Sequence, residues 1–451
     1  MALYRLAWRA KQGRSIGKAS MRVAMIGTGY VGLVSGACLS EFGHHVVCID
    51  KDKSKIDALK AGKIPIFEPG LEDVVAANVK SGRLAFSQSL AEAVSDADAV
   101  FIAVGTPSRR GDGHADLTYV FAAAEEIAAA LKGYTVVVTK STVPVGTGRQ
   151  VEEVIRKARP DADVDVVSNP EFLREGSAIE DFRRPDRVVV GCDTERARNT
   201  MTEVYRPLYL NETPILFTSR ESSELIKYAA NAFLATKITF INEMADICEK
   251  TGADVQDVAR GIGLDGRIGS KFLHAGPGFG GSCFPKDTLA LLKTSQSFGV
   301  PTRIVEAVVA VNDRRKINMA EKIERAFGGL NGKTVAMLGL TFKPNTDDMR
   351  DAPSLVIVPY LQSKGARIQA YDPEGAKEAR ALLQIDPCAD AYEALKDADG
   401  VVILTEWNEF RALDLNRVKS LLISPLMVDL RNIYRPAQMQ AAGFTYISVG
   451  R

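Results

Sequence analysis

The stretch MRVAMIGTGYVG, residues 21–32, decides the fold of the first part of the chain. Its first half is a short apolar run that predicts a strand. The second half, Gly27-Thr28-Gly29-Tyr30-Val31-Gly32, is a G-x-G-x-x-G turn that opens a helix pattern of small residues reaching Phe42. In this strand–turn–helix context the pattern predicts a dinucleotide site. The first glycine makes the turn, the second lets a pyrophosphate approach, and the third packs helix on strand.

The end of the next predicted strand, His45–Asp50, indicates which dinucleotide is bound. A carboxylate at Asp50 accepts hydrogen bonds from the adenosine ribose and repels a 2′-phosphate, so NAD is predicted as the cofactor. Lys55, one turn into the following helix, tempers the preference for NAD over NADP. Further cofactor contacts are predicted at Gly105-Thr106-Pro107 and Thr142, because these residues follow two other strands at the ligand-binding carboxyl edge of the sheet.

The order of elements predicts an α/β fold. Strand-like runs at 99–104, 135–139 and 164–168 alternate with helical patterns, which predicts a parallel sheet with helices on both faces. We assign residues 21–210 to an NAD-binding Rossmann-like domain. Residues 218–251 lack glycine and proline and keep an apolar periodicity, so they predict one long helix, with Thr218-x-x-Glu221 as a capping box.

The rest of the chain predicts two further domains. Residues 211–328 form a central helical domain that contains the long helix and the cysteine loop described below. Residues 329–451 form a second Rossmann-like domain, with strands at 334–338, 367–371, 400–404 and 426–429. Asp372-Pro373 follows its strand much as Asp50 does, which suggests a site for another nucleotide. The predicted fold class is therefore two doubly wound Rossmann-like domains, joined by a long central helix and a small helical domain.

Composition narrows the class of protein. Hydrophobic residues make up 46% and charged residues 25%, with a net charge of +1. These values are typical of a globular protein and do not favour nucleic acid or a membrane as partner. Six cysteines without C-x-x-C pairing predict a reducing compartment and a cytoplasmic location. The four histidines show no metal-ligand spacing, so no metal site is predicted. Residues 1–20, basic and without acids, are interpreted as an extension outside the fold, with a transit peptide or an amphipathic surface helix as alternatives.

A second decisive stretch is GPGFGGSCFPKD, residues 276–287. It places Cys283 at the end of a glycine-rich loop, and Pro285 predicts a helix that starts just after it. A thiol at a helix N-terminus beside Lys286 has its thiolate form favoured. A cysteine able to hold an acyl group, together with a hydride-accepting cofactor, indicates oxidation of an alcohol past the aldehyde to an acid. The alternative is a buried, structural cysteine.

Taken together, these motifs resemble the UDP-glucose/GDP-mannose dehydrogenase family from Met21 to the C-terminus. The resemblance rests on the fingerprint with Asp50, on a helix face shared by Lys227 and Asn231, and on five further segments: VGTPS at 104–108, STVPVG at 141–146, NPEFLREGSAIEDF at 169–182, KFLHAGPGFGGSCFPKD at 271–287 and GLTFKPNTDDMRDAPS at 339–354. It implies a four-electron oxidation, in which UDP-glucose, two NAD and water give UDP-glucuronate and two NADH.

The resemblance also implies roles for individual residues. Cys283 is the nucleophile, and Lys227 and Asn231 stabilise the oxyanion. Asp287, Thr142 and Glu171 organise water and protons, with the base of each half-reaction left open. The cofactor contacts are Gly27, Gly29, Tyr30, Val31, Gly32, Asp50, Lys55, Gly105, Thr106, Pro107, Thr142, Glu175, Lys286 and Arg350. The substrate contacts are Glu171, Phe172, Leu173, Arg174, Lys227, Asn231, Arg267, Phe272, Leu273, His274, Ala275, Gly276, Gly280, Phe342, Lys343 and Arg431. Arg267 is implied to reach a neighbouring subunit's site, so a homo-oligomer, at least a dimer, is expected.

Three alternatives remain open at this point. The same chemistry could act on another nucleotide sugar, such as GDP-mannose or a UDP-N-acetylhexosamine. The chain could instead be an ordinary two-electron dehydrogenase in which Cys283 is structural. The third alternative is a protein that binds NAD without turnover. A substrate panel and a count of NADH formed per sugar distinguish them.

Overall fold

The computed structural model describes residues 20–107 and 115–451. Residues 1–19 of the predicted N-terminal extension lie outside the described residues. Ser108 of the VGTPS motif does too. The chain separates into two compact units, and the main boundary falls between Leu225 and Ile226, inside a helix. The short segment 67–69 and the described ends of the segment 107–115 group with the second unit. The N-terminal and C-terminal units are described in turn.

The N-terminal unit is built on an eight-stranded sheet in the order β3-β2-β1-β4-β5-β6-β7-β8. The strands are β1 Arg22–Ile26, β2 His45–Ile49, β3 Leu84–Ser87, β4 Ala99–Ile102, β5 Thr135–Thr139, β6 Val164–Ser168, β7 Val188–Gly191 and β8 Ile215–Thr218. The first six are parallel, in the order of a Rossmann fold. β7 is antiparallel to β6, so the expectation of a purely parallel sheet is wrong at this edge.

Alternate side chains of these strands supply two cores, one on each face of the sheet. One face includes Val23 and Met25 and is covered by α2 Tyr30–Glu41, α4 Leu71–Lys80, α8 Ala178–Arg183 and α9 Glu195–Val204. The other includes Ala24 and Ile26 and is covered by α5 Leu90–Ser95, α6 Thr118–Ala130 and α7 Thr147–Ala158. The remaining helices are α3 Lys53–Lys60 and the 3-10 helix η1 Arg206–Asn211. The alternation follows from the period of two in a strand.

The buried His44 joins the start of this sheet to α9. Its Nδ1 accepts a hydrogen bond from Met21 N at 3.1 Å, so Nε2 carries the proton and donates to Val204 O at 2.8 Å. Burial lowers the pKa of His44, and the charge of Arg206 lowers it further, while the Val204 carbonyl and Glu203 oppose the shift. The neutral imidazole therefore belongs to the folded state.

The predicted long helix is α10, Arg220–Thr251, a continuous helix of 32 residues. The predicted capping box is wrong by one residue, because Thr218 ends β8. Ser219 provides the cap instead, and its hydroxyl accepts a hydrogen bond from Ser222 N at 3.2 Å. β8 lies beyond the predicted domain boundary at residue 210 but belongs to the N-terminal sheet.

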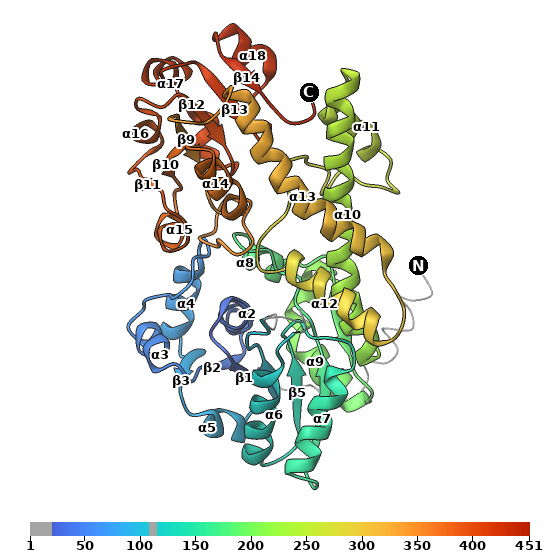
Figure 1. Ribbon diagram of the computed structural model, residues 1–451. Helices are drawn as coiled ribbons and strands as arrows, with labels where there is room; N and C mark the ends of the chain where they lie inside the picture. Colours follow the sequence, from blue (N-terminus) through green and yellow to red (C-terminus); the bar gives the residue numbers. More distant parts are fainter. Residues whose placement is uncertain (1–19, 108–114) are drawn as a thin grey trace. The chain divides into compact units, whose positions relative to one another are not determined.

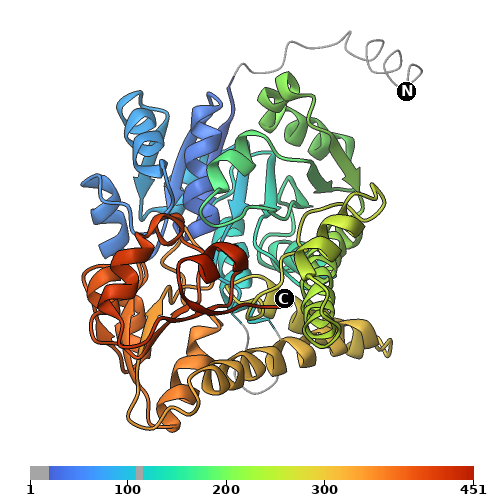
Figure 2. The same ribbon diagram turned by 90° about the horizontal axis from the view of Figure 1, so that it is seen from above.

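Three more helices precede the second sheet: α11 Val255–Gly263, α12 Phe284–Ser297 and α13 Arg303–Ala326. In Figure 2, α13 is the long gold helix. Side chains of α10 and α13, among them Ile241, Ala245, Met319 and Ile323, pack into the same core as the first strand of the second sheet. The central helices therefore share a hydrophobic core with the C-terminal sheet, and their separation into two domains stays a prediction.

The C-terminal sheet has the order β11-β10-β9-β12-β13-β14, and all of its strands are parallel. The strands are β9 Thr334–Leu338, β10 Arg367–Tyr371, β11 Asp386–Pro387, β12 Gly400–Ile403, β13 Leu426–Asp429 and β14 Thr445–Ile447. α14 Ser354–Ser363 packs on one face with α15 Ala376–Leu382. α16 Ala391–Leu395, η2 Asn408–Ala412, α17 Leu415–Leu421 and α18 Pro436–Ala441 pack on the other (Figure 1). The predicted fold class of two Rossmann-like sheets and a long helix is confirmed.

Candidate functional site: a dinucleotide turn and a cysteine loop

The glycine turn after β1 has the form that a dinucleotide requires. Gly27 has φ +105°, and its N–H donates to Ile49 O at 2.7 Å. A Cβ on Gly32 would lie 2.0 Å from Gly27 O, so no side chain fits there. A Cβ on Gly29 would meet nothing within 4 Å. Gly29 thus borders open space at the N-terminus of α2, where amides and the helix dipole favour a phosphate.

Asp50 is held beside this turn. Its Oδ2 accepts hydrogen bonds from Thr28 N at 2.9 Å and Thr28 Oγ1 at 2.7 Å, and Oδ1 accepts from Asp52 N at 3.0 Å. Burial alone would raise the pKa of Asp50, but these bonds and the charge of Lys55 outweigh it and lower the pKa. Asp50 is therefore an anion, half-buried, as adenosine binding requires. The residues present fit NAD, and its role when bound is to accept hydride.

Other predicted cofactor residues of this unit lie near the fingerprint or on neighbouring turns. The hydroxyl of Tyr30 accepts a hydrogen bond from Gly176 N at 3.1 Å, which joins the start of α2 to the segment of Glu175. Thr106 Oγ1 donates to Thr142 O at 2.9 Å, which joins the turns after β4 and β5. Gly105 and Pro107 are exposed, and Val31 is half-buried.

The segment after β6 carries the predicted substrate residues of the N-terminal unit. Glu171 is buried, and its Oε2 accepts a hydrogen bond from Leu173 N at 2.5 Å. The ring of Phe172 is covered by the Arg187 guanidinium at 3.8 Å, a cation–π contact. Arg174 forms a forked ion pair with Asp181, so its guanidinium is already paired within the protein.

The cysteine lies at the N-terminus of a helix, as predicted. α12 begins at Phe284, Cys283 is its N-cap residue, and Pro285 stands in the first turn. Asp287 is 1% exposed, and its Oδ2 accepts from Asn231 Nδ2 at 2.6 Å. Its Oδ1 accepts from Lys286 Nζ at 2.8 Å. Lys227 is also buried, one turn before Asn231 on α10. The structure thus brings Asn231 and Asp287 together beside the start of the cysteine helix.

The backbone of the glycine loop is fixed by side chains that the sequence did not suggest. Gly276 N donates to Asn242 Oδ1 at 2.8 Å, and Gly276 O accepts from Arg315 Nε at 3.0 Å. Asn312 accepts from Phe279 N at 2.8 Å and donates to Phe279 O at 3.1 Å. Gly276 is predicted to contact substrate, but both its N–H and its carbonyl have partners within the protein. The one signal in the sequence for these contacts is that Asn242 and Asn312 lie inside helices, where asparagine is unfavourable unless its amide has a partner.

The loop also packs on the carboxyl edge of the C-terminal sheet. A Cβ on Gly280 would lie 2.3 Å from Asp351 O, and one on Gly281 would lie 2.6 Å from the Phe342 ring. Arg431 donates to Phe342 O at 2.9 Å, and its Nη1 would lie 3.4 Å from a Cβ on Gly276. The structure thus brings together four predicted substrate residues, Gly276, Gly280, Phe342 and Arg431. The sequence analysis interpreted the glycines of this loop as allowing a ligand to approach. The structure shows that they also allow the loop to pack closely on the C-terminal sheet.

The remaining predicted residues differ in exposure. Lys343 Nζ lies 5.3 Å from the centroid of the Phe342 ring. Arg350 is ion-paired with Asp348, and its carbonyl accepts a hydrogen bond from Gly281 N at 2.7 Å. Arg267 is paired with Asp265, and its side chain is 90% exposed. Among residues 272–275, Leu273 and Ala275 are buried, Phe272 is half-buried with φ +65°, and His274 is exposed.

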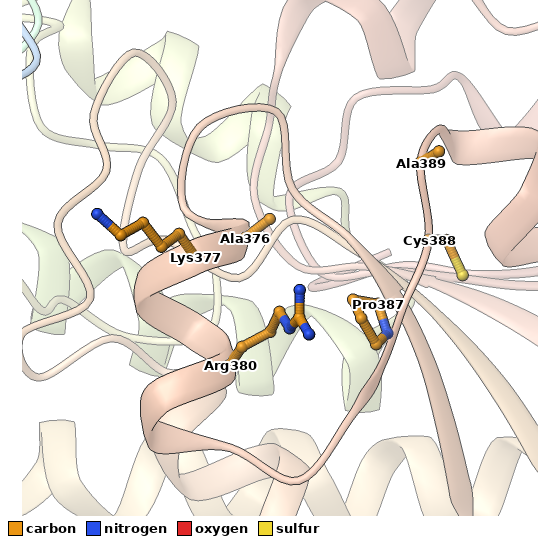
Figure 3. Close-up of a pocket in the computed structure, with 6 residues that line it drawn as sticks. All are labelled: Ala376, Lys377, Arg380, Pro387, Cys388 and Ala389. Atoms are coloured by element: carbon orange, nitrogen blue, oxygen red, sulfur yellow. The ribbon is translucent and has the colours of Figure 1, made fainter.

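A shallow cavity of about 540 Å³ lies between α15 and β11, at the edge of the C-terminal sheet. Figure 3 shows Arg380 pointing toward Pro387, while Lys377 points away from it. None of the predicted site residues lines this cavity. Within residues 20–107 and 115–451 there is no cluster of metal-ligating side chains, and none of the helices found there has the length and hydropathy to span a membrane.

A Rossmann glycine turn with an anionic carboxylate beside it, in a chain that also carries a cysteine at a helix N-terminus, is typical of NAD-dependent dehydrogenases. Comparison with known families narrows the class. Residues 21–209 match the NAD binding domain of the UDP-glucose/GDP-mannose dehydrogenase family, residues 221–314 its central domain and residues 336–436 its UDP binding domain.

Individual relatives agree with the family match. The chain is 67% identical over 435 residues to the UDP-glucose 6-dehydrogenase of Rhizobium meliloti (strain 1021), covering 96% of this chain and 100% of the relative. It is 51% identical to UDP-glucose 6-dehydrogenase TuaD of Bacillus subtilis (strain 168), covering 95% and 93%. A solved UDP-glucose dehydrogenase of Pyrobaculum islandicum superposes with a TM-score of 0.88 at 39% identity, covering 96% and 98%. The chain belongs to the UDP-glucose/GDP-mannose dehydrogenase family, as the sequence motifs predicted.

Proposed function

We propose that this chain oxidises UDP-glucose to UDP-glucuronate, with NAD as the hydride acceptor in two successive steps. The family, the NAD binding domain and the relatives named UDP-glucose 6-dehydrogenase support this substrate over GDP-mannose or a UDP-N-acetylhexosamine. The observation that carries the proposal is Cys283 at the N-cap of α12, with the Asn231–Asp287 pair beside that helix. An ordinary two-electron dehydrogenase has no need of this thiol.

The reaction balances as follows. The C6 alcohol loses a hydride and a proton and becomes an aldehyde. The sulfur of Cys283 adds to the aldehyde carbon, with a proton going to the oxygen, and gives a thiohemiacetal. Loss of a second hydride and a proton gives a thioester. Water then adds to the thioester carbon, the C–S bond breaks, and the carboxylate and the thiol are released. The covalent bond keeps the intermediate in place while one NADH leaves and another NAD enters.

The side chains near α12 supply the polar groups for this chemistry. Lys227 brings a buried ammonium and Asn231 a side-chain amide, the two kinds of donor that stabilise an oxyanion. Asp287 already accepts hydrogen bonds from Asn231 and Lys286. We propose that Asp287 orients the Asn231 amide and takes part in proton transfer. Thr142 and Glu171, on turns of the N-terminal unit, are proposed to order the hydrolytic water.

The C-terminal unit is proposed to bind the UDP moiety. Lys343 and Arg431 supply cations at the carboxyl edge of its sheet, where ligands of open α/β sheets bind. Arg431 is largely buried, holds Phe342 O and Leu404 O, and is paired with Glu406 at 3.0 Å. It therefore shapes the Phe342-Lys343 turn, and a phosphate would share its charge with that carboxylate. Phosphate binding at Lys343 and Arg431 would influence the position of the loop that carries Cys283. Arg431 holds the carbonyl of Phe342, and the Phe342 ring packs closely on Gly281 of that loop.

The test is a count of NADH formed per UDP-glucose consumed. Two NADH per sugar, with UDP-glucuronate as product, is the expected result. One NADH per sugar supports the two-electron alternative, and faster turnover of GDP-mannose overturns the assigned substrate. Cys283→Ala should abolish acid formation while NAD still binds. Cys388→Ala is the matched control, since Cys388 is a partly exposed cysteine outside the proposed site, and burial raises the pKa of its thiol.

The chain is also proposed to act as a homo-oligomer, at least a dimer, in the cytoplasm. Three large apolar side chains of α10 recur every seven residues, Phe233, Phe240 and Ile247, with exposed fractions of 65%, 45% and 53%. A stripe with this spacing lies along one side of a helix and suits a second helix of the same kind. The exposed Arg267 is proposed to reach the partner's site, as the family resemblance implies.

A further inference from the structure

Glu224 is a buried carboxylate that sequence reasoning did not select. It lies on the second turn of α10, is 3% exposed, and accepts three hydrogen bonds. Oε2 accepts from Gly146 N at 2.6 Å, and Oε1 accepts from Gly148 N and from Ser168 Oγ, both at 2.8 Å. Burial raises the pKa of Glu224, and the three donors oppose that shift. A carboxylate is stable in such a place only because it is fully hydrogen-bonded.

The three donors belong to two segments that carry predicted site residues. Gly146 and Gly148 form the N-terminus of α7, which ends the turn containing Thr142. Ser168 is the last residue of β6, and Glu171 follows it by three residues. Ser168 is held a second time, because Ser223 Oγ donates to Ser168 O at 2.8 Å. The first turns of α10 therefore fix both segments from one side.

The packing around Gly148 supports this arrangement. A Cβ on Gly148 would lie 2.7 Å from Ser168 Oγ and 3.0 Å from Glu224 Oε1, so this position admits only glycine while the carboxylate is in place. The N-terminal amides of α7 have no partners within the helix. Glu224 caps them from another helix, where the dipole of α7 favours a negative charge.

We propose that Glu224 is a positioning residue for hydrolysis of the covalent intermediate, because it sets the Thr142 turn and the Glu171 segment at a fixed separation. The inference rests on the proposed function, in which Thr142 and Glu171 order the water that attacks the thioester. Displacement of such groups by about 1 Å can cost on the order of 100-fold in rate. Hydride transfer does not consume that water, so it is expected to slow less than hydrolysis.

The isosteric variant Glu224→Gln tests this role. Its amide group turns an N–H toward the N–H of Gly146 or Gly148 and removes at least one of the three bonds. The matched control is Glu221→Gln. Glu221 lies one turn earlier on α10 and pairs with Arg149 of α7, so it joins the same two helices without contacting Ser168 or the α7 amides. Both variants are compared with wild type for NAD affinity, thermal unfolding, rapid NADH formation and steady-state turnover.

The expected result separates the two half-reactions. Glu224→Gln should still form two NADH per chain rapidly, while the later steady-state rate falls at least roughly tenfold. NAD affinity is expected to change by less than that factor, because Thr142 is only one of many predicted cofactor contacts. A covalent acyl adduct on Cys283 should accumulate and be seen by mass spectrometry. Glu221→Gln should behave as wild type.

Two results overturn the inference: Glu224→Gln that turns over like Glu221→Gln, or Glu224→Gln in which rapid and steady-state rates fall equally without an adduct. If Glu224→Gln does not fold, Ser168→Ala replaces it. That variant removes one donor and leaves two, so the same pattern is expected at smaller amplitude, and wild-type turnover in Ser168→Ala contradicts the proposal. Failure of the proposed function is recognised separately, since wild type itself would then not form two NADH from UDP-glucose.

Discussion

Gly29→Ala should separate cofactor binding from folding. Gly29 has φ −71° and ψ −173°, an extended conformation that alanine adopts without strain, and its added Cβ meets nothing within 4 Å. The substitution should therefore leave the free energy of unfolding unchanged or raise it by about 0.4–1 kcal/mol, because alanine has less conformational entropy to lose. The open space beside Gly29 is nevertheless where the pyrophosphate is expected to lie.

The cost to NAD binding can be worked from the same geometry. A methyl group in that space prevents the phosphate from reaching the amides at the N-terminus of α2, and loss of one charge-assisted hydrogen bond costs about 1.5–3 kcal/mol. The Kd for NAD should rise about 10- to 150-fold. Titration calorimetry measures the Kd and thermal unfolding measures stability.

Gly133→Ala is the control for this prediction. Gly133 also has open space, but it lies just before β5, at the opposite, amino edge of the sheet. Its alanine variant should bind NAD as wild type does. If Gly29→Ala binds NAD within twofold of Gly133→Ala, the pyrophosphate does not lie at Gly29 and the reasoning fails.

Three other predictions follow from the packing. His44→Gln should remove a pH dependence of the free energy of unfolding. Because the pKa of His44 is lowered in the folded state, its contribution to stability is present above the unfolded pKa of about 6.5 and is lost as pH falls below that value. The difference in unfolding free energy between wild type and variant should therefore shrink from pH 7.5 to pH 5.5, and a constant difference contradicts this. Gly280→Ala, whose Cβ would lie 2.3 Å from Asp351 O, should lower turnover by displacing the cysteine loop while the Kd for NAD stays unchanged, and wild-type turnover would show that the loop adapts. Phe240→Asp should shift sedimentation from dimer toward monomer, whereas Ile423→Asp, at another exposed apolar residue, should not.

The sequence predicted the bounds of many inner strands of the two sheets closely, because these strands are continuous apolar runs bounded by turns. The ranges 135–139, 164–168, 334–338 and 367–371 agree with the observed strands at both ends. β7 and β8 were missed for different reasons. β8 is the edge strand and none of its four residues is buried, so it lacks a clear apolar pattern, whereas β7 is a fully buried run of only four residues, too short to be told from other apolar segments. Local pattern cannot tell that β7 runs antiparallel, because direction is set by pairing with β6 and not by its own residues.

The sequence predicted those features of the candidate site that depend on local motifs. Cys283 at a helix N-terminus, Asp50 beside the glycine turn and the shared face of Lys227 and Asn231 all follow from local spacing. The residues that hold those groups did not follow. Asn312 hydrogen-bonds to the backbone of the cysteine loop, and Glu224 hydrogen-bonds to the end of the Thr142 turn. Both lie on helices distant in sequence from the segments that they hold. A single sequence contains no signal for such long-range hydrogen bonds, beyond the presence of polar side chains on otherwise apolar helix faces.

Each of the two Rossmann-like sheets has an aspartate directly after its second strand, but the two aspartates have different roles. Asp372 stands after β10 as Asp50 stands after β2, and the analogy suggested a second nucleotide site of the same kind. Asp372, however, is 1% exposed. Its Oδ2 accepts from Leu340 N, Thr341 N, Thr341 Oγ1 and Trp407 Nε1, and its Oδ1 accepts from Glu374 N and Gly375 N.

A carboxylate with its acceptor capacity filled in this way has no oxygen left for a ribose diol. Asp50, half-buried with fewer internal donors, keeps that capacity. A nucleotide bound by the C-terminal sheet must therefore be held by other groups, and we expect Lys343, together with Arg431 and its partner Glu406, to act at the phosphates. Asp372→Asn should accordingly destabilise the fold without a selective loss of UDP affinity, while Lys343→Ala should weaken UDP binding and leave thermal unfolding unchanged. A selective loss of UDP affinity in Asp372→Asn, measured by calorimetry, would restore the ribose role.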